Sequence, residues 1–256
     1  MRQAKDTLTQ RLCELAKRKG AVVCGIASVD DADALEPIKI ELKSINRYTQ
    51  PLRAAMPNAK SAIIFGVAST DDVDEIEIER ENGDLEYPGY TMLYVIARDL
   101  MRRIRMEGYE AAHPPFPSPE KRIAKLAGIG NYGKSSLIIH PRYGPWLRFG
   151  LVLTDAELDP SAPFEKDLCG RCHRCVDACP AGAIKPYVVS PNSCLVALTR
   201  VKNASPKAKA LLNRHSPELT PQSRLMCREC QLACRYTTAR RRQNVITAPS
   251  PRRGKR

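Results

Sequence analysis

The sequence lacks any long apolar run: no stretch of its 256 residues approaches about 18 consecutive apolar residues. A helix that crosses a membrane needs about 20 such residues, so we expect no membrane span. The first residues, Met1-Arg2-Gln3-Ala4-Lys5, also lack the apolar core of a secretory signal. We therefore expect a cytoplasmic protein whose thiols stay reduced, which disfavours disulfides.

Acidic residues are missing from the end of the sequence, since residues 235–256 contain eight bases and no acid. The chain carries a formal net charge of +13, although residues 71–86 hold nine acids against one base. We interpret the basic segment as a disordered tail that either only solubilises the chain or contacts an anionic partner such as tRNA. Within the acidic segment, Glu75-Ile76-Glu77-Ile78-Glu79 alternates like an exposed edge strand or loop. A basic surface also favours an acidic electron donor of the ferredoxin or flavodoxin kind.

Cysteine, in contrast, is abundant, and eight of the ten cysteines lie within residues 169–234. Their spacing is Cys169-x2-Cys172-x2-Cys175-x3-Cys179-Pro180, then Cys194, then Cys227-x2-Cys230-x3-Cys234. The first run has the bacterial ferredoxin spacing, in which three cysteines bind one 4Fe–4S cluster and the fourth binds the other cluster. Two clusters need eight thiolates, so the spacing predicts two 4Fe–4S clusters and one-electron chemistry.

Zinc and disulfides are the alternatives for these cysteines. A zinc site normally takes four ligands from two CxxC pairs, without a third cysteine at the same interval, so zinc is disfavoured. Cys13 and Cys24 lie far from the other eight, on segments with apolar periodicity. We predict that both are buried as small apolar side chains.

Local patterns predict an α/β domain over residues 1–160. Apolar periodicity predicts helices over residues 8–20, 90–107 and 119–127 and strands over 21–27, 61–68, 135–140 and 148–155. Helices that alternate with strands are typical of layered α/β domains. We expect a ferredoxin-like double-cluster module to follow over residues 161–238, and the basic tail to cover 239–256.

A glycine-rich stretch, Gly128-Ile129-Gly130-Asn131-Tyr132-Gly133-Lys134-Ser135, matches two nucleotide-binding patterns, GxGxxG and GxxxxGKS. Both patterns need a strand before the glycines and a helix after them, because the helix N-terminus binds the phosphate. Here a predicted helix comes before and a predicted strand after. We therefore do not expect nucleotide hydrolysis, and we interpret the glycines as permitting close approach to a ligand or to another element.

The chain resembles a known family, the epoxyqueuosine reductases and their reductive-dehalogenase relatives, over roughly residues 124–234. The resemblance rests on the glycine-rich stretch, the ferredoxin run, Cys194-Leu195-Val196-Ala197-Leu198-Thr199, and Cys227-Arg228-Glu229-Cys230-Gln231-Leu232-Ala233-Cys234. It implies a nitroreductase-like α/β domain with a base-off cobalamin beside one cluster. It also implies Gly128, Gly130, Gly133 and Lys134 as contacts of the cobalamin.

The resemblance further implies two crossed sets of cluster ligands. Cys169, Cys172, Cys175 and Cys234 would bind one cluster, and Cys179, Cys194, Cys227 and Cys230 the other. Epoxyqueuosine reductases also carry an acidic proton donor before the glycine-rich stretch. The corresponding residues here, Tyr109-Glu110-Ala111-Ala112-His113-Pro114-Pro115, have no such aspartate. The remaining candidates for a proton donor are Tyr87, Tyr90, Tyr109 and His113.

We therefore predict an iron–sulfur oxidoreductase. Electrons pass through two 4Fe–4S clusters to a cobalamin-type cofactor that reduces an unidentified substrate. The alternatives are a non-catalytic electron-transfer protein, or a redox subunit that docks to a partner enzyme. The long members of the family continue into a helical tRNA-binding region, where this sequence has its basic segment.

Overall fold

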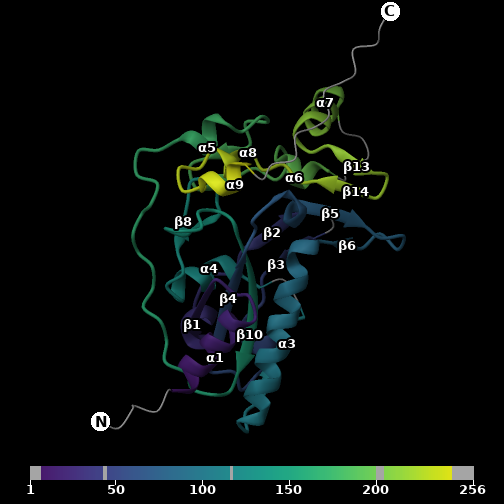
Figure 1. Cartoon of the computed structure of the whole chain (residues 1–256). Coiled ribbons are helices and arrows are strands. Elements are labelled where there is room, and N and C mark those ends of the chain that lie inside the picture. Colours follow the sequence, from purple (N-terminus) through teal and green to yellow (C-terminus); the bar gives the residue numbers. More distant parts are fainter. Residues whose placement is uncertain (1–6, 43–44, 116–117, 200–204, 244–256) are drawn as a thin grey trace, which may run out of the picture.

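The computed structural model describes residues 7–42, 45–115, 118–199 and 205–243. An antiparallel sheet lies at its centre (Figure 1). Its strand order is β1 (Val23–Ser28), β4 (Ser61–Ala68), β10 (Leu147–Thr154) and β7 (Ala111–Ala112). β4 pairs with β10 along its whole length, from Ser61 opposite Thr154 to Ala68 opposite Leu147. Because β4 lies inside the sheet, nearly all of its side chains are buried.

Helices cover both faces of this sheet. α1 (Leu8–Arg18) and α3 (Thr91–Met106) pack on one face, and α2 (Val29–Asp33) and α4 (Glu120–Leu126) pack on the other. Figure 1 labels α1, α3 and α4 around the sheet. In α3 the buried residues recur at helical spacing and meet the sheet: Leu93, Ile96, Ala97, Leu100 and Ile104. The predicted α/β domain is therefore confirmed as three layers.

Several predicted elements agree with the structure. β4 has the predicted bounds, α3 differs by one residue at each end, and α4 precedes the glycine-rich stretch as expected. The strand predicted over 135–140 shortens to β9 (Ile138–Ile139), which pairs with β8 (Asn131–Tyr132). The order of helix, glycines and strand, which argued against a phosphate loop, is thus present in the fold.

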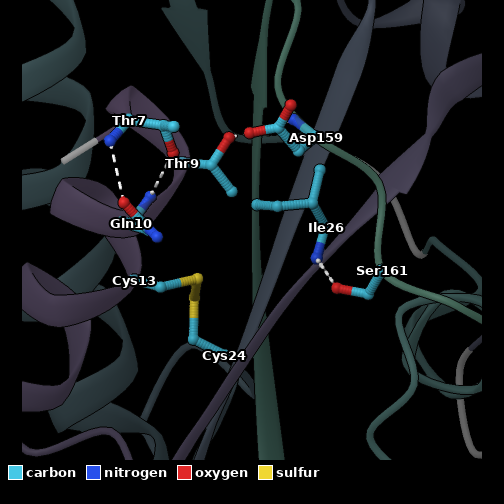
Figure 2. Close-up of a disulfide and its surroundings, with 8 residues drawn as sticks. All are labelled: Thr7, Thr9, Gln10, Cys13, Cys24, Ile26, Asp159 and Ser161. Carbon is cyan, nitrogen blue, oxygen red and sulfur yellow. Dashed lines mark hydrogen bonds between the residues drawn. A yellow bond between two sulfur atoms is a disulfide. The ribbon is translucent and has the colours of Figure 1, made fainter. Parts of the chain in front are cut away.

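Cys13 and Cys24 form a disulfide, shown in Figure 2, so the expectation of two separate buried thiols is wrong. Cys13 lies on α1 and Cys24 on β1, which the chain joins by a short turn at Gly20. Packing of α1 against the sheet brings the two Cα atoms to 5.5 Å. That separation is within the range a disulfide spans. The sequence patterns predicted the helix and the strand separately, but they did not predict that Cys13 and Cys24 lie within bonding distance.

The segment over 155–168 connects the sheet to the cluster module and runs along the side of the domain (Figure 1). The backbone N–H of Asp159 donates to Thr9 Oγ1 over 2.9 Å, and Ser161 Oγ accepts from the N–H of Ile26 over 3.1 Å (Figure 2). The predicted boundary is therefore an extended connection bound to the first helix and strand.

The alternating acidic stretch Glu75-Ile76-Glu77-Ile78-Glu79 is part of a second sheet and does not form an exposed edge, which corrects the expectation from its pattern. The strand order is β13 (Glu218–Thr220), β14 (Ser223–Leu225), β5 (Ile76–Glu79) and β6 (Leu85–Glu86), so β5 is an inner strand. A turn before β5, η2 (Asp72–Glu75), contributes two buried carboxylates. This sheet joins the α/β domain to the cluster module.

The remaining elements are short and lie mainly around the cysteines. They are β2 (Lys39–Leu42), β3 (Ile45–Tyr48), η1 (Leu52–Ala54), η3 (Pro88–Tyr90), α5 (Arg174–Asp177), β11 (Ile184–Lys185), β12 (Val188–Val189), α6 (Leu195–Leu198), α7 (Pro206–His215), α8 (Glu229–Leu232) and α9 (Ala239–Gln243). Among the described residues no helix has the length and hydropathy of a membrane span.

The start of the predicted disordered tail is also wrong, because α9 is helical and anchored. The Arg241 side chain is buried, its guanidinium lies 3.8 Å from the centre of the Trp146 ring, and it donates to Asp72 over 2.9 Å. Residues 244–256 lie outside the described residues.

Candidate functional site: two cysteine sets and a cavity

The eight cysteines of the cluster module are all free and partly buried. Short helical turns present several of them: Cys175 lies on α5, Cys194 precedes α6, and Cys230 lies on α8. α5 and α8 pack against each other, which brings together two cysteine runs that are far apart in sequence. The module thus forms around its cysteines and not around a large apolar core.

Two cavities divide the eight cysteines into two sets of four. We name the first cysteine set for the residues that line the smaller cavity: Cys169, Cys172, Cys175 and Cys234. We name the second cysteine set for those that line the larger cavity: Cys179, Cys194, Cys227 and Cys230. Each set takes residues from both runs, which is the crossed arrangement that the resemblance implies.

Backbone hydrogen bonds shape the loop that carries the first set. The Asp167 carboxylate accepts from the N–H groups of Cys169, over 2.8 Å, and Gly170, over 3.0 Å. These bonds lower the pKa of Asp167, so the loop is held by an ionised carboxylate at neutral pH. Gly170 has a φ of 51°, a conformation that glycine adopts without strain.

The second set lies in a more buried environment. Burial raises the pKa of Cys227 to about 11 and also raises the pKa of Cys230. Without a metal these side chains are neutral thiols at physiological pH. Iron would therefore have to displace their protons on binding, as metals do at thiolate sites.

The larger cavity has a volume of about 650 Å³ and lies between the sheet domain and the second cysteine set. Its wall is largely apolar, with side chains from three regions of the chain: Leu137, Ile138, Leu147, Phe149, Leu195, Val196 and Met226. Charged and titratable side chains also line it: Lys39, Glu75, Tyr90, Glu120, Lys121 and Arg148. Apolar walls with a few polar groups are typical of ligand sites, whose volumes run from about 300 to 1,000 Å³.

An ion pair is built into the cavity wall. Arg148, on β10, donates to the carboxylate of Glu75, which is 2% exposed and also accepts from Ser69 Oγ over 2.6 Å. Both partners hold the Glu75 carboxylate in place. The Arg148 guanidinium lies 5.7 Å from the centre of the Tyr90 ring, and burial raises the pKa of Tyr90. This part of the wall is therefore held by the ion pair of Arg148 and Glu75, beside the neutral phenol of Tyr90.

Glu120 is a second carboxyl of the wall, and it has a different environment. It lies in the first turn of α4, and Ser118 Oγ donates to it over 3.0 Å. Burial raises its pKa, which favours the protonated form. Its neighbour Lys121 donates to the carbonyl of Ser136 over 3.1 Å. Lys121 lines the cavity, and desolvation of its ammonium group there lowers its pKa.

Of the four proton-donor candidates from the sequence, only Tyr90 lines the cavity. Tyr87 donates to Glu77 over 2.7 Å, Tyr109 is exposed, and His113 Nδ1 lies 2.9 Å from the carbonyl oxygen of Leu151. Sequence reasoning missed Glu120. Its signal is the Ser118-Pro119-Glu120 start of α4, which reads only as a helix N-terminus.

The glycine-rich stretch packs against the protein itself. A Cβ on Gly128 would lie 2.6 Å from the carbonyl oxygen of Ala162, and a Cβ on Gly130 would lie 2.5 Å from that of Ile139. A Cβ on Gly133 would lie 2.5 Å from Ile139 Cγ1. The glycines are therefore required for close packing of this loop on its neighbours.

Lys134 ties the same stretch to the first cysteine set. Its ammonium group is buried and donates to the carbonyl of Gly170 over 2.7 Å, and it lies 3.2 Å from His173 Nε2. None of Gly128, Gly130, Gly133 and Lys134 lines the larger cavity, whereas the next four residues, 135–138, do. The predicted contact of these four residues with a cofactor stays a prediction.

Comparison with known proteins agrees with this geometry. Residues 168–237 match the family described as a 4Fe-4S double cluster binding domain. An epoxyqueuosine reductase of Listeria monocytogenes is 36% identical over 115 residues, which cover 44% of this chain and 28% of that protein. One from Pseudomonas aeruginosa is 30% identical over 165 residues, 57% of this chain and 43% of that protein. The matches thus span less than half of these relatives.

Solved structures share the fold. An epoxyqueuosine reductase from Bacillus subtilis aligns with a TM-score of 0.66 at 20% identity, covering 91% of this chain and 66% of that chain. An epoxyqueuosine reductase with an epoxyqueuosine-modified tRNA-Tyr stem loop aligns with a TM-score of 0.65, at 20% identity and the same coverage. A reductive dehalogenase described as B12-dependent aligns with a TM-score of 0.58 at 16% identity, covering 95% of this chain and 35% of that chain.

The likeness in fold extends over nearly the whole chain, whereas the matched domain covers the eight cysteines. Both agree with the order of glycine-rich stretch and cysteine runs in the sequence. Residues 168–237 therefore form a 4Fe-4S double cluster binding domain, and the chain is similar in sequence to epoxyqueuosine reductases and in fold to these enzymes and to reductive dehalogenases.

Proposed function

We propose that the chain is an iron–sulfur reductase that passes single electrons through two 4Fe–4S clusters into the larger cavity. The observation that carries this proposal is the position of the second cysteine set in the wall of that cavity. A ligand in the cavity would lie directly beside the second cluster. The first set lies outside the cavity and would receive the electrons.

We assign the first cysteine set to one cluster and the second set to the other. Each iron of a 4Fe–4S cluster takes its own thiolate, so the four sulfurs lie further apart than around one ion. Within the described residues, no three or more His, Cys, Asp or Glu side chains are grouped as ligands of a single metal ion. Four thiols around each cavity fit a cluster better than zinc.

The cofactor that we propose for the larger cavity is a cobalamin. The apolar wall fits the body of a large ring cofactor, and the second cysteine set lies at its edge. Leu137, Phe149 and Leu195 would contact such a ring. When bound, cobalamin would supply the metal centre at which a substrate accepts electrons.

The chain itself would supply a proton. Reduction of a substrate by two electrons is generally accompanied by proton uptake, and the proton needs a donor near the reacting atoms. We propose Glu120 for this role, because it is the cavity carboxyl whose surroundings favour the protonated form. We do not assign the role to Glu75, because its carboxylate is already engaged by the Arg148 guanidinium and by Ser69 Oγ.

A non-catalytic electron carrier is the alternative function. Such a protein needs its clusters near the surface, but it has no use for a cavity with buried acids and a fixed ion pair. The presence of Glu75, Glu120 and Arg148 in one wall favours the reductase. Substrate reduction by the purified chain would decide between the two.

A tRNA is the substrate class that the tRNA-bound structural neighbour and the net charge of +13 suggest. Contacts with phosphates give binding that weakens steeply as salt increases. We expect binding of a tRNA stem loop to show this salt dependence. Deletion of residues 244–256 would test whether the basic tail contributes to this binding. Unchanged binding by the shortened chain would exclude the tail as a tRNA contact.

Anaerobic reconstitution tests the main proposal. We expect about eight irons per chain from two four-iron clusters, with the visible absorption lost on reduction. Cobalamin is then titrated into the reconstituted protein and its visible spectrum is recorded. A full iron content without any spectral change of cobalamin would support the two clusters and would contradict the proposal of cobalamin as the cofactor.

Paired serine substitutions test the crossed ligand sets. Cys230→Ser with Cys179→Ser removes two ligands of the second set, so about four irons should remain. Cys230 and Cys234 are close in sequence but belong to different sets. Cys230→Ser with Cys234→Ser therefore removes one ligand from each set, and the iron content of both clusters should fall. The measurement is iron content together with the electron paramagnetic resonance of the reduced protein. Equal retention of one cluster in both double variants would refute the crossed sets.

A further inference from the structure

Four exposed arginines surround the first cysteine set. Arg174 and Arg235 line the smaller cavity together with the four sulfurs. Arg171 lies in the loop between the first two cysteines, and Arg242 donates to the carbonyl of Cys234 over 3.0 Å. We name these four residues the arginine face. They come from two segments that are more than sixty residues apart in sequence and meet only in the fold.

The charge of the arginine face is largely uncompensated. Within the described ranges, none of its four guanidinium groups forms an ion pair with a carboxylate. Of the nearby acids, Asp167 is engaged by two backbone N–H groups, and Asp177 is exposed on α5. The surface over the first cysteine set is therefore net positive.

The positions of the two cysteine sets indicate the direction in which electrons would pass. The second set borders the larger cavity, whose other walls come from the sheet domain, from α6 and the segment before it, and from Met226. The first set is adjacent to the exposed arginines. α5 connects the two, because it carries Cys175 and is followed by Cys179. The short path for an electron thus runs from the arginine face through the first set to the second.

We propose that the arginine face is the docking surface for a small acidic protein that donates one electron at a time, of ferredoxin or flavodoxin type. This inference rests on the proposed function, since it needs both clusters. The donor loses one electron and the first cluster gains it, so no proton or further reactant takes part. Carboxylates on the donor would pair with the guanidinium groups and orient it over the first set.

Charge reversal tests the face in the reconstituted holoprotein. The variant is Arg171→Glu with Arg174→Glu, and its control is Arg102→Glu, an exposed arginine near the C-terminal end of α3. That end of the helix points away from the cluster module (Figure 1). Reduction by a pre-reduced acidic plant-type ferredoxin is followed in a stopped-flow instrument as loss of cluster absorption. We expect the second-order rate at low salt to fall by about tenfold or more in the double variant and to change little in the control. The salt dependence should also flatten.

Reduced methyl viologen, a cation, serves as the second donor. It should reduce the charge-reversed protein at least as fast as the wild type, which shows that the clusters are intact. Equal rates with ferredoxin for Arg171→Glu/Arg174→Glu and for Arg102→Glu would overturn the docking surface while leaving the proposed function in place. Absence of iron from the wild type would reject both. Unchanged ferredoxin rates with loss of tRNA stem-loop binding would assign the face to RNA instead.

Discussion

At the scale of single residues, the most informative group is Glu120, because its environment and not its sequence context gives it a role. The carboxyl lies at the start of α4, accepts from Ser118, and is enclosed by the cavity wall. A helix N-terminus normally favours an ionised carboxylate. Here burial outweighs that effect and raises the pKa.

The raised pKa predicts how Glu120→Gln changes stability with pH. Between the unfolded and the folded pKa the folded wild type binds more protons, so its stability falls as pH rises through that window. Glutamine does not titrate and avoids this loss. We expect the variant to gain in melting temperature relative to wild type, by about 2 °C or more between about pH 4.5 and about pH 7.5. The measurement is thermal unfolding of the metal-free protein at both pH values.

Glu157→Gln is the control for this experiment, since Glu157 is exposed. It should show no such dependence on pH. A melting temperature of Glu120→Gln that tracks the wild type at both pH values would contradict the assignment of Glu120 as a protonated group, and with it the proposed proton donor.

At the scale of elements, the acidic segment shows how charge alone can mislead. Nine acids within residues 71–86 indicate an exposed strand or loop, yet β5 is an inner strand. The reason is the position of the counter-ions: Asp72 is 1% exposed and accepts from Arg228 and Arg241. These arginines lie 156 and 169 residues away along the chain. Local sequence carries no sign of them.

This buried ion cluster predicts a large effect of Asp72→Asn. The substitution leaves two buried guanidinium groups without their carboxylate, and loss of one partner of a buried pair costs about 3–5 kcal/mol. We expect the melting temperature to fall on the order of 10 °C. Glu81→Gln, at an exposed acid of the same segment, should change it little. Similar small effects of both variants would mean that the cluster does not hold the segment in place.

At the scale of the whole molecule, the two halves are stabilised differently. Both large apolar clusters consist of residues up to Leu158, on either face of the central sheet. The cluster module has only scattered buried apolar residues, such as Ile184, Leu195 and Leu225. A small domain with little core commonly depends on its metal for stability.

Removal of iron should therefore loosen one half of the molecule. We expect hydrogen exchange to accelerate over residues 168–237 and in β5 and β6, which share the second sheet with β13 and β14. β4 and β10 should stay protected, because their core contains no cluster ligand. Hydrogen exchange with mass spectrometry of the iron-loaded and the iron-free protein measures this. Equal loss of protection in β4 would show that the chain unfolds as one unit.

The sequence by itself determined the features that depend on neighbours along the chain. Cysteine spacing indicated two iron–sulfur clusters, and apolar periodicity predicted α3 and β4 closely, because ligand spacing and helical or strand period are local. Only the tertiary structure decided which side chains line the larger cavity, which acid of its wall has a raised pKa, and where four arginines gather. Burial and charge pairing join residues that are distant in sequence, as with Asp72 and Arg241, so no local pattern contains them.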